Sequence, residues 1–311
     1  MSVITVNNIV KRFGDFTAVD NVSFEARKGR IFGILGPNGA GKTTTLRMIN
    51  YITIPDEGSI NITGMQASAE TQKKIGYLPE ERGLYKKMQV GEQLLYLARL
   101  KGMTDADAKT SINYWLKRFK AETWIKKKVS ELSKGMQQKI QFISTIAHNP
   151  EICIFDEPFS GLDPINSELL REVILELHEK GKTILFATHR MEQVEQMCDD
   201  ICLFNNGKVI LKGALGDIKR SFGRNTVNLQ YEGDGSFLKD YPGIRLNNRS
   251  ANFAEIRILD NDPEADVKLL RTAIEHVRVI KFEFVEPSLN EIFISTVNDD
   301  STKTLNSKKP A

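Results

Sequence analysis

Short apolar segments alternate with amphipathic segments over the first two thirds of the chain. Residues 30–35, 151–156 and 182–188 are the clearest apolar runs, and apart from their charged ends they show no alternation with polar positions. Unbroken runs of this length are typical of parallel strands buried on both faces, and together with the intervening helical periodicity they predict an α/β fold. Residues 4–10 and 18–26 alternate more clearly, which predicts antiparallel or edge strands.

Residues 91–148 show helical periodicity and no convincing strand. This stretch predicts a helical insertion in a sheet domain that we expect to cover residues 1–219. Inside it, Ser133 stands as an N-cap before a helix whose apolar face includes Met136 and Ile140.

The pattern changes after residues 205–213, where an Asn-Gly pair predicts a hairpin turn. Beyond it, Pro287 and Ser288 indicate the start of a helix. A small α+β domain is expected over residues 220–297, and the polar residues 298–311 predict a disordered tail. Three alternating strand candidates and one amphipathic helix in that domain cover residues 226–231, 254–259, 279–284 and 263–276.

Composition excludes some classes of protein. The chain has 43 Lys and Arg against 40 Asp and Glu, and a net charge of +3 gives no argument for a nucleic-acid partner. The three cysteines are too few for a disulfide framework and indicate a reducing compartment. No stretch has the roughly 18 to 20 apolar residues that cross a bilayer. We therefore expect a cytosolic protein, or one that docks on a membrane through a partner.

A glycine-rich sequence follows the apolar run 30–35 and opens a predicted helix, and it matches the G-x-x-x-x-G-K-T phosphate-binding loop. Glycines let main-chain N–H groups turn inward, where side chains would obstruct them. Lys42 supplies a positive charge to the phosphates of a nucleotide, and Thr43 offers a hydroxyl to Mg²⁺. The candidate nucleotide-binding residues here are Gly36, Pro37, Asn38, Gly39, Ala40, Gly41, Lys42, Thr43 and Thr44.

Two acidic residues end the apolar run 151–156. Asp156 is a candidate ligand of Mg²⁺, and Glu157 is a candidate base for the water that attacks the γ-phosphate. His189 ends the next apolar run, and it is expected to bond the γ-phosphate and orient that water. All three follow strands whose carboxyl ends share one edge of a parallel sheet, which is where such sheets bind ligands.

Ser133 and Gly135 raise a question, because they stand at a second helix start equipped to bind an anion. The chain already has one complete phosphate-binding loop. Spacing alone does not say which phosphate the second helix start would meet.

With these pieces together, residues 2–219 resemble the ATP-binding subunit of an ABC transporter. The resemblance rests on the phosphate-binding loop, "LSKGM" at 132–136, "IFDE" at 154–157, "SGLD" at 160–163 and "TH" at 188–189, in the order of that family. It implies a P-loop NTPase core with a mixed sheet, and the cofactors ATP and Mg²⁺.

The resemblance also implies a head-to-tail pair of subunits. Ser133 and Gly135 of one subunit would cap the ATP held by the other, and Asp163 would link the two sites. Phe13 matches the aromatic residue that stacks on adenine, and Val19 would line the base and ribose. Because both sites look competent, a pair of identical chains is favoured over a pair with a related chain.

Two departures from the family pattern stand out. Lys134 and Met136 replace the Gly and Gln of the usual "LSGGQ", and Glu80 stands where the family has a Gln that approaches Mg²⁺. The segment "PEERGLY" and the C-terminal domain resemble export-type subunits related to sodium and drug exporters.

Without a membrane span, the chain would need separate transmembrane permease subunits, and it would lie at the cytoplasmic face of the cell membrane. A cleft lined by residues 80–97 is expected to receive a helix of those subunits. Two alternatives remain at this point: an ATPase switch of translation or DNA repair that moves no solute, and a nucleotide-binding scaffold that does not hydrolyse.

Overall fold

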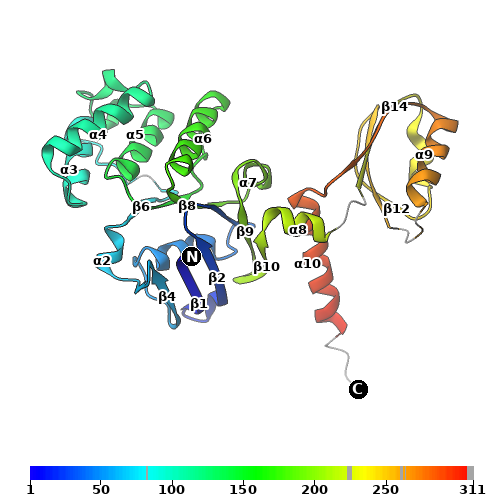
Figure 1. Ribbon diagram of the computed structural model, residues 1–311, viewed down its shortest axis with the longest axis horizontal. Helices are drawn as coiled ribbons and strands as arrows, with labels where there is room; N and C mark the ends of the chain where they lie inside the picture. The colour runs from blue at the N-terminus through cyan, green and yellow to red at the C-terminus, as the bar shows by residue number, and fades with distance from the viewer. Residues whose placement is uncertain (82, 223–225, 260–261, 263, 307–311) are drawn as a thin grey trace. The chain divides into compact units, whose positions relative to one another are not determined.

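The computed structural model describes residues 1–81, 83–222, 226–259, 262 and 264–306. The chain forms two compact units, Met1–Ala214 and Leu215–Ala311. The domain boundary expected after residue 219 therefore falls five residues later than the division between these units, inside helix α8 (Leu215–Ser221). Each unit is considered separately below (Figure 1).

A six-stranded sheet forms the centre of the first unit, with strand order β10-β9-β3-β8-β7-β6. The pairs among β9, β3, β8, β7 and β6 are parallel, and β10 joins β9 antiparallel, so the sheet is mixed as expected. Every residue of β3, β7 and β8 is buried, which explains their unbroken apolar sequences. The strands are β3 (Ile31–Leu35), β6 (Ile75–Leu78), β7 (Ile152–Asp156), β8 (Thr183–Thr188), β9 (Asp200–Asn205) and β10 (Lys208–Ala214).

The expected hairpin at residues 205–213 is formed by β9 and β10. Asn205 pairs with Lys208, and the two residues between them, Asn206 and Gly207, have φ values of 47° and 77°. Positive φ at both positions is the geometry of a type I′ turn, for which Asn-Gly is the favoured sequence.

An antiparallel sheet of order β2-β1-β4-β5 packs on the central sheet through one shared core. The long hairpin of β1 and β2 confirms the antiparallel expectation for the N-terminal segments. The register of this hairpin shifts at several points. The strands are β1 (Ser2–Phe13), β2 (Phe16–Arg27), β4 (Glu57–Ile62) and β5 (Met65–Gln66).

Residues 91–148, all of which are described, contain helices and no strand, so the helical insertion is present. Its helices α3, α4 and α5 gather into one lobe, beside α6 (Figure 1). Ser133 caps α5 as expected, since its hydroxyl accepts a hydrogen bond from the N–H of Met136. The helices of the first unit are α1 (Lys42–Ile49), α2 (Ala69–Gln72), α3 (Val90–Leu100), α4 (Asp105–Arg118), α5 (Lys134–Ile146), α6 (Pro164–Glu179) and α7 (Met191–Met197), with short 3-10 turns η1 (Glu122–Trp124) and η2 (Val129–Glu131).

The second unit is a four-stranded antiparallel sheet of order β12-β13-β11-β14, with α9 packed on the core that one face provides. This is the expected α+β architecture. Its elements are α8, β11 (Thr226–Glu232), η3 (Gly235–Lys239), β12 (Ile244–Arg249), β13 (Phe253–Ile258), α9 (Ala265–His276), β14 (Arg278–Val285) and α10 (Leu289–Asn306).

Helix α10 begins after Ser288, whose hydroxyl accepts a hydrogen bond from the N–H of Glu291. It continues to Asn306, so the expected disorder from residue 298 is wrong as far as 306. Polar residues cannot build a core, but they can continue a helix whose first turns are already fixed. The rest of the expected tail, 307–311, lies outside the described residues. Among those described, no helix combines the length and the apolarity needed to cross a membrane.

Candidate nucleotide-binding site

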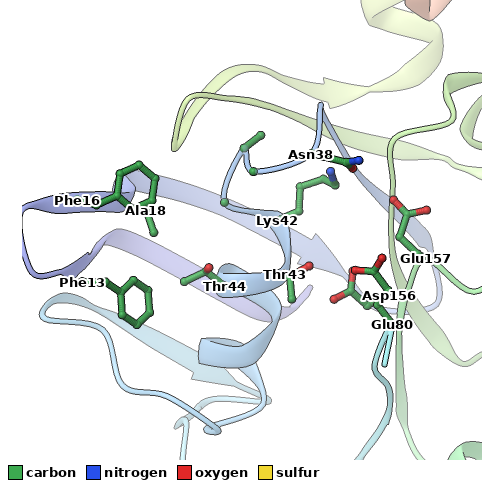
Figure 2. Close-up of a pocket in the computed structure, with 13 residues that line it drawn as sticks. Phe13, Phe16, Ala18, Asn38, Lys42, Thr43, Thr44, Glu80, Asp156 and Glu157 are labelled. Carbon is green, nitrogen blue, oxygen red and sulfur yellow. The ribbon is translucent and has the colours of Figure 1, made fainter. Parts of the chain in front are cut away.

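A pocket of about 350 Å³ opens at the carboxyl edge of the central sheet. Figure 2 shows two aromatic side chains at one end of it, three carboxylates at the other, and Lys42 and Thr43 between them. This order suits a ligand with an aromatic base at one end and phosphates at the other. The lining residues are Phe13, Phe16, Ala18, Asn38, Gly39, Ala40, Gly41, Lys42, Thr43, Thr44, Glu80, Asp156 and Glu157.

Two glycines of the loop are required by their backbone and by their neighbours. Gly36 has φ 145°, and a Cβ there would lie 2.3 Å from the carbonyl oxygen of Phe204. Gly41 has φ 100°, and its Cβ would lie 2.5 Å from the carbonyl oxygen of Ala18. No ordinary Cβ contact is that short, so only glycine permits the turn that leads from β3 into α1. Gly41, Lys42, Thr43 and Thr44 at the start of α1 line the pocket, and a helix start of this kind is a ready-made site for an anion.

Lys42 lies in the first turn of α1 and is only 6% exposed. Its Nζ donates hydrogen bonds to the carbonyl oxygens of Gly36 at 2.7 Å and Pro37 at 3.0 Å. Burial lowers the pKa of Lys42, and the nearby carboxylates of Glu157 and Asp156 oppose that shift. Gly36 and Pro37 thus hold the lysine through their carbonyl oxygens and do not themselves line the pocket.

Asp156 ends β7 and is 1% exposed. Within the described part of the chain, neither of its carboxylate oxygens has a hydrogen-bond partner of ordinary geometry. Burial raises the pKa of Asp156 to about 6, and the neighbouring Thr43 hydroxyl opposes that shift. A buried carboxylate with two unused oxygens is costly unless a cation meets it.

The residues present fit Mg²⁺. The described residues contain no group of three His, Cys, Asp or Glu side chains that would cage a metal. Mg²⁺ is commonly held by one or two carboxylates together with phosphate oxygens, and a hydroxyl can complete the set. The oxygens of Thr43, Asp156 and Glu80 line the same end of the pocket and offer such a set.

Glu157 follows Asp156 directly but has different surroundings. Its φ of 48° is left-handed, which is strained for this residue type. One carboxylate oxygen accepts a hydrogen bond from the Thr188 hydroxyl at 3.1 Å, and the other accepts from the main-chain N–H of His189 at 2.9 Å. The ring Nδ1 of His189 lies 2.7 Å from that second oxygen. Because an ionised carboxylate only accepts, Nδ1 carries the proton, and the half-exposed ring is oriented by Glu157.

The aromatic end of the pocket differs in part from expectation. Phe13 and Phe16 face each other across the end of the β1–β2 hairpin and are 54% and 63% exposed. Val19 does not line the pocket, because its side chain is fully buried in the core. Ala18 lines the pocket in its place, and Phe16 is a second aromatic residue that sequence analysis missed.

Ser133, Gly135 and Asp163 do not line this pocket, although the chain brings them near one another. A Cβ on Gly135 would lie 3.9 Å from the side chain of Leu162, the neighbour of Asp163. Asp163 caps α6, and the hydrogen bonds from Asn166 lower its pKa. The second helix start is therefore separate from the pocket of its own chain.

Comparison with protein families gives two matches. Residues 19–160 match the family model described as ABC transporter, and residues 213–297 match the model described as ATP-binding protein DrrA1-3-like, C-terminal domain. The two matches fall on the first and second structural units respectively.

Individual relatives match between about two thirds and 95% of the chain. The "Uncharacterized ABC transporter ATP-binding protein YhaQ" of Bacillus subtilis is 46% identical, over 95% of this chain and 98% of that protein. The "Nod factor export ATP-binding protein I" of Burkholderia lata is 37% identical, over 68% of this chain and 70% of its own length.

Solved structures resemble about seven tenths of the chain. One titled "Structure of ATP binding subunit of ABC transporter" is 31% identical with a TM-score of 0.68, covering 71% of this chain and 94% of that one. A bacterial ABC transporter cassette solved as a dimer is 26% identical with a TM-score of 0.63, covering 68% of this chain and 98% of its own.

Proposed function

The chain belongs to the ATP-binding subunits of ABC transporters, and from that premise we propose that it hydrolyses ATP to drive export through separate membrane subunits. The observation that carries the proposal is the position of Asp156. Its buried carboxylate, which has no hydrogen-bond partner of ordinary geometry among the described residues, shares the pocket with a complete phosphate-binding loop, an arrangement that a nucleotide with a divalent cation would stabilise.

In this reaction, seven residues that line the pocket and the neighbouring His189 have assigned roles. The loop N–H groups and Lys42 bind the phosphates, and the aromatic side chains of Phe13 and Phe16 hold the base. Thr43, Asp156 and Glu80 would hold Mg²⁺, which when bound neutralises charge on the phosphate oxygens. Glu157 takes the proton of the attacking water, and His189 bonds the γ-phosphate and keeps the water in line.

Among the described residues, Ser133 and Gly135 do not line the pocket of their own chain. In the proposed function, Ser133 and Gly135 of a second copy cover the phosphates, so that two chains enclose two nucleotides head to tail. Such an interface is self-complementary, since each chain gives a loop to one site and a helix start to the other. The dimeric cassette among the structural relatives supports this arrangement.

Export is proposed because a relative carries that activity in its name. The membrane subunits would contact the segment 80–97, with the chain peripheral at the cytoplasmic face of the membrane. The switch of translation or DNA repair is set aside, because the relatives are named as subunits of transporters.

Hydrolysis is tested with the purified full chain, ATP and Mg²⁺. Glu157→Gln should lower the rate of phosphate release at least about 100-fold, because a general base contributes a rate enhancement of that size or more. Glu151→Gln is the matched control, because Glu151 precedes the same strand at its opposite end and is exposed. Equal rates in the wild type and Glu157→Gln would overturn the assigned base, and no release by the wild type would overturn the activity.

Pairing is tested by mixing two inactive variants, Lys42→Ala and Ser133→Arg. If each site combines the loop of one chain with Ser133 of the other, mixed pairs contain one intact site. Random mixing in equal amounts should then restore about a quarter of the wild-type rate. If each chain completed its own site, no mixture would regain activity, and that result would refute the head-to-tail pair.

A further inference from the structure

Helix α5 carries a row of glutamines whose side-chain amides do not point to solvent. Gln138 and Gln141, one turn apart, are 5% and 4% exposed. Each donates to main-chain carbonyl oxygens of a segment distant in sequence. The first turn of the same helix carries Ser133 and Gly135, the part of the chain proposed to meet the nucleotide of a second copy.

Gln141 holds the segment that carries Glu80. Its Nε2 donates to the carbonyl oxygens of Pro79 at 3.4 Å and Glu81 at 3.1 Å, the two neighbours of Glu80. At the other end of this segment, the N–H of Tyr85 donates to Oε1 of Gln93 on α3 at 3.1 Å. Glu80 is thus placed in the phosphate end of the pocket by contacts to the main chain on either side of it.

Gln138 makes the corresponding contact on the side of Glu157. Its Nε2 donates to the carbonyl oxygen of Pro158, the residue after Glu157, at 3.2 Å. Glu157 needs such support, because its left-handed backbone is strained and persists only when the surroundings fix it. One helix therefore fixes both acidic segments that border the pocket.

Packing alone does not explain Gln141. Its Oε1 is buried and has no partner among the described residues, and the same holds for Nε2 of Gln93. An unpaired buried polar atom lowers stability, so an apolar side chain of the same length would suit a merely structural position better. Burying the amide of Gln141 lowers stability, but its Nε2 fixes the main chain of residues 79–81 through two hydrogen bonds.

We propose that Gln141 and Gln138 are positioning residues for ATP hydrolysis: through Pro79, Glu81 and Pro158 they couple the acidic groups of one pocket to the helix that the chain presents to its partner. The inference rests on the proposed function, since it assigns Glu80 a place at the metal. A change at Glu80 when nucleotide binds is transmitted along α5 to Ser133. The two sites of a pair then respond to each other without any contact between their nucleotides.

The decisive variant is Gln141→Met, which keeps the length of the side chain and removes the donor. ADP binding is measured by equilibrium titration with and without Mg²⁺, and the gain in affinity from Mg²⁺ is compared. We expect Gln141→Met to reduce that gain by about tenfold. This is the lower end of the loss in metal affinity when a residue that positions a metal ligand is mutated. Hydrogen exchange at residues 80–88 should accelerate, and exchange at residues 134–138 should no longer respond to Mg²⁺ and ADP.

Gln72→Met is the matched control, because Gln72 also donates to a main-chain carbonyl oxygen, that of Asn50, and touches neither acidic segment. It should leave the gain unchanged. Combining Gln141→Met with Glu80→Gln should reduce the gain no further than Glu80→Gln alone, because Gln141 acts through Glu80. Gln141→Asn, which withdraws the amide by one methylene, should show the same effects if Gln141→Met does not fold.

Two results would overturn the inference while leaving the proposed function intact. One is that Mg²⁺ increases the ADP affinity of Gln141→Met as much as that of the wild type, while hydrogen exchange at residues 80–88 stays unchanged. The other is that the double variant, Gln141→Met with Glu80→Gln, reduces the gain from Mg²⁺ by the product of the two single reductions. If the wild type itself shows no gain from Mg²⁺, the proposed function fails, and the inference fails with it.

Discussion

Replacing Asp156 by Asn should make the chain without nucleotide more stable while abolishing the proposed ATP hydrolysis. The carboxyl group is buried, and burial raises its pKa from 3.8 to about 6. At 1.36 kcal/mol for each pKa unit, the charged form costs the folded state about 3 kcal/mol at neutral pH. Asn carries no charge, but its buried amide lacks partners and takes back about 1–2 kcal/mol. The free energy of unfolding should therefore rise by about 1–2 kcal/mol.

The sign of the pH dependence provides a second check. An acid whose pKa is raised on folding contributes stability that is fully present below its unfolded pKa of 3.8 and is lost as the pH rises through about 6. At pH 7.5 the wild type bears the whole penalty, and at pH 5 it bears about half of it. The advantage of Asp156→Asn over the wild type should therefore shrink between pH 7.5 and pH 5.

Urea unfolding in the presence of a chelator, at both pH values, measures these differences. Asp200→Asn is the matched control, because Asp200 is also buried but forms ion pairs with Arg27 and Arg30. That variant should lose about 1–3 kcal/mol, since a charged hydrogen-bonded group is removed from its partners. If Asp156→Asn were less stable than the wild type at both pH values, the Asp156 carboxylate would have a partner in the folded chain. The proposal that it binds a cation would then be refuted.

Three further predictions concern the phosphate-binding loop, the aromatic residues Phe13 and Phe16, and the Asp163 cap of α6. Gly41→Ala should lower the unfolding temperature more than Gly39→Ala, because a Cβ at Gly41 would meet the carbonyl oxygen of Ala18, whereas a Cβ at Gly39 would have no atom within 4 Å. Thermal unfolding without nucleotide ranks the two variants, and equal losses would contradict this geometry of the loop. Phe13→Ala and Phe16→Ala should each weaken ADP binding by about 1 kcal/mol, measured by titration, and an unchanged affinity in Phe16→Ala would exclude it from the base site. Asp163→Ala should destabilise the chain by about 1 kcal/mol through loss of the α6 cap, while Asp163→Asn, which keeps a capping oxygen, should recover most of that loss.

Sequence patterns predicted the elements whose surroundings are uniform. The three unbroken apolar runs became β3, β7 and β8, because strands buried on both faces need apolar residues throughout. Strands with mixed surroundings left weaker patterns. The short β4 and β12 contain polar residues and were not predicted, since their burial depends on partners remote in sequence.

Val19 shows why the pocket could be predicted only in part. Val19 was assigned to the base and ribose from the family resemblance, which does not give the register of this hairpin, and the pairing of β1 with β2 shifts between Ile9 and Lys11 and again between Lys11 and Arg12. These shifts place the Val19 side chain in the core and bring Ala18 to the pocket. The glutamines of α5 escaped notice for another reason: their partners are main-chain carbonyls of distant segments, which leave no trace in residue spacing.

In the proposed reaction, the different surroundings of Asp156, which ends β7, and of Glu157, which follows it, would give the two carboxylates different roles. Asp156 has no hydrogen-bond partner of ordinary geometry among the described residues, whereas its neighbour Glu157 accepts from Thr188 and twice from His189. A group without partners gains most from a cation, and a group already fixed by three donors gains least from one and keeps a defined direction toward a water. Glu157 also has a left-handed backbone, with φ 48°, a strained conformation that persists only where the surroundings fix it. A substitution that relaxed this backbone would therefore move the Glu157 carboxylate away from its donors, even with the carboxylate itself retained.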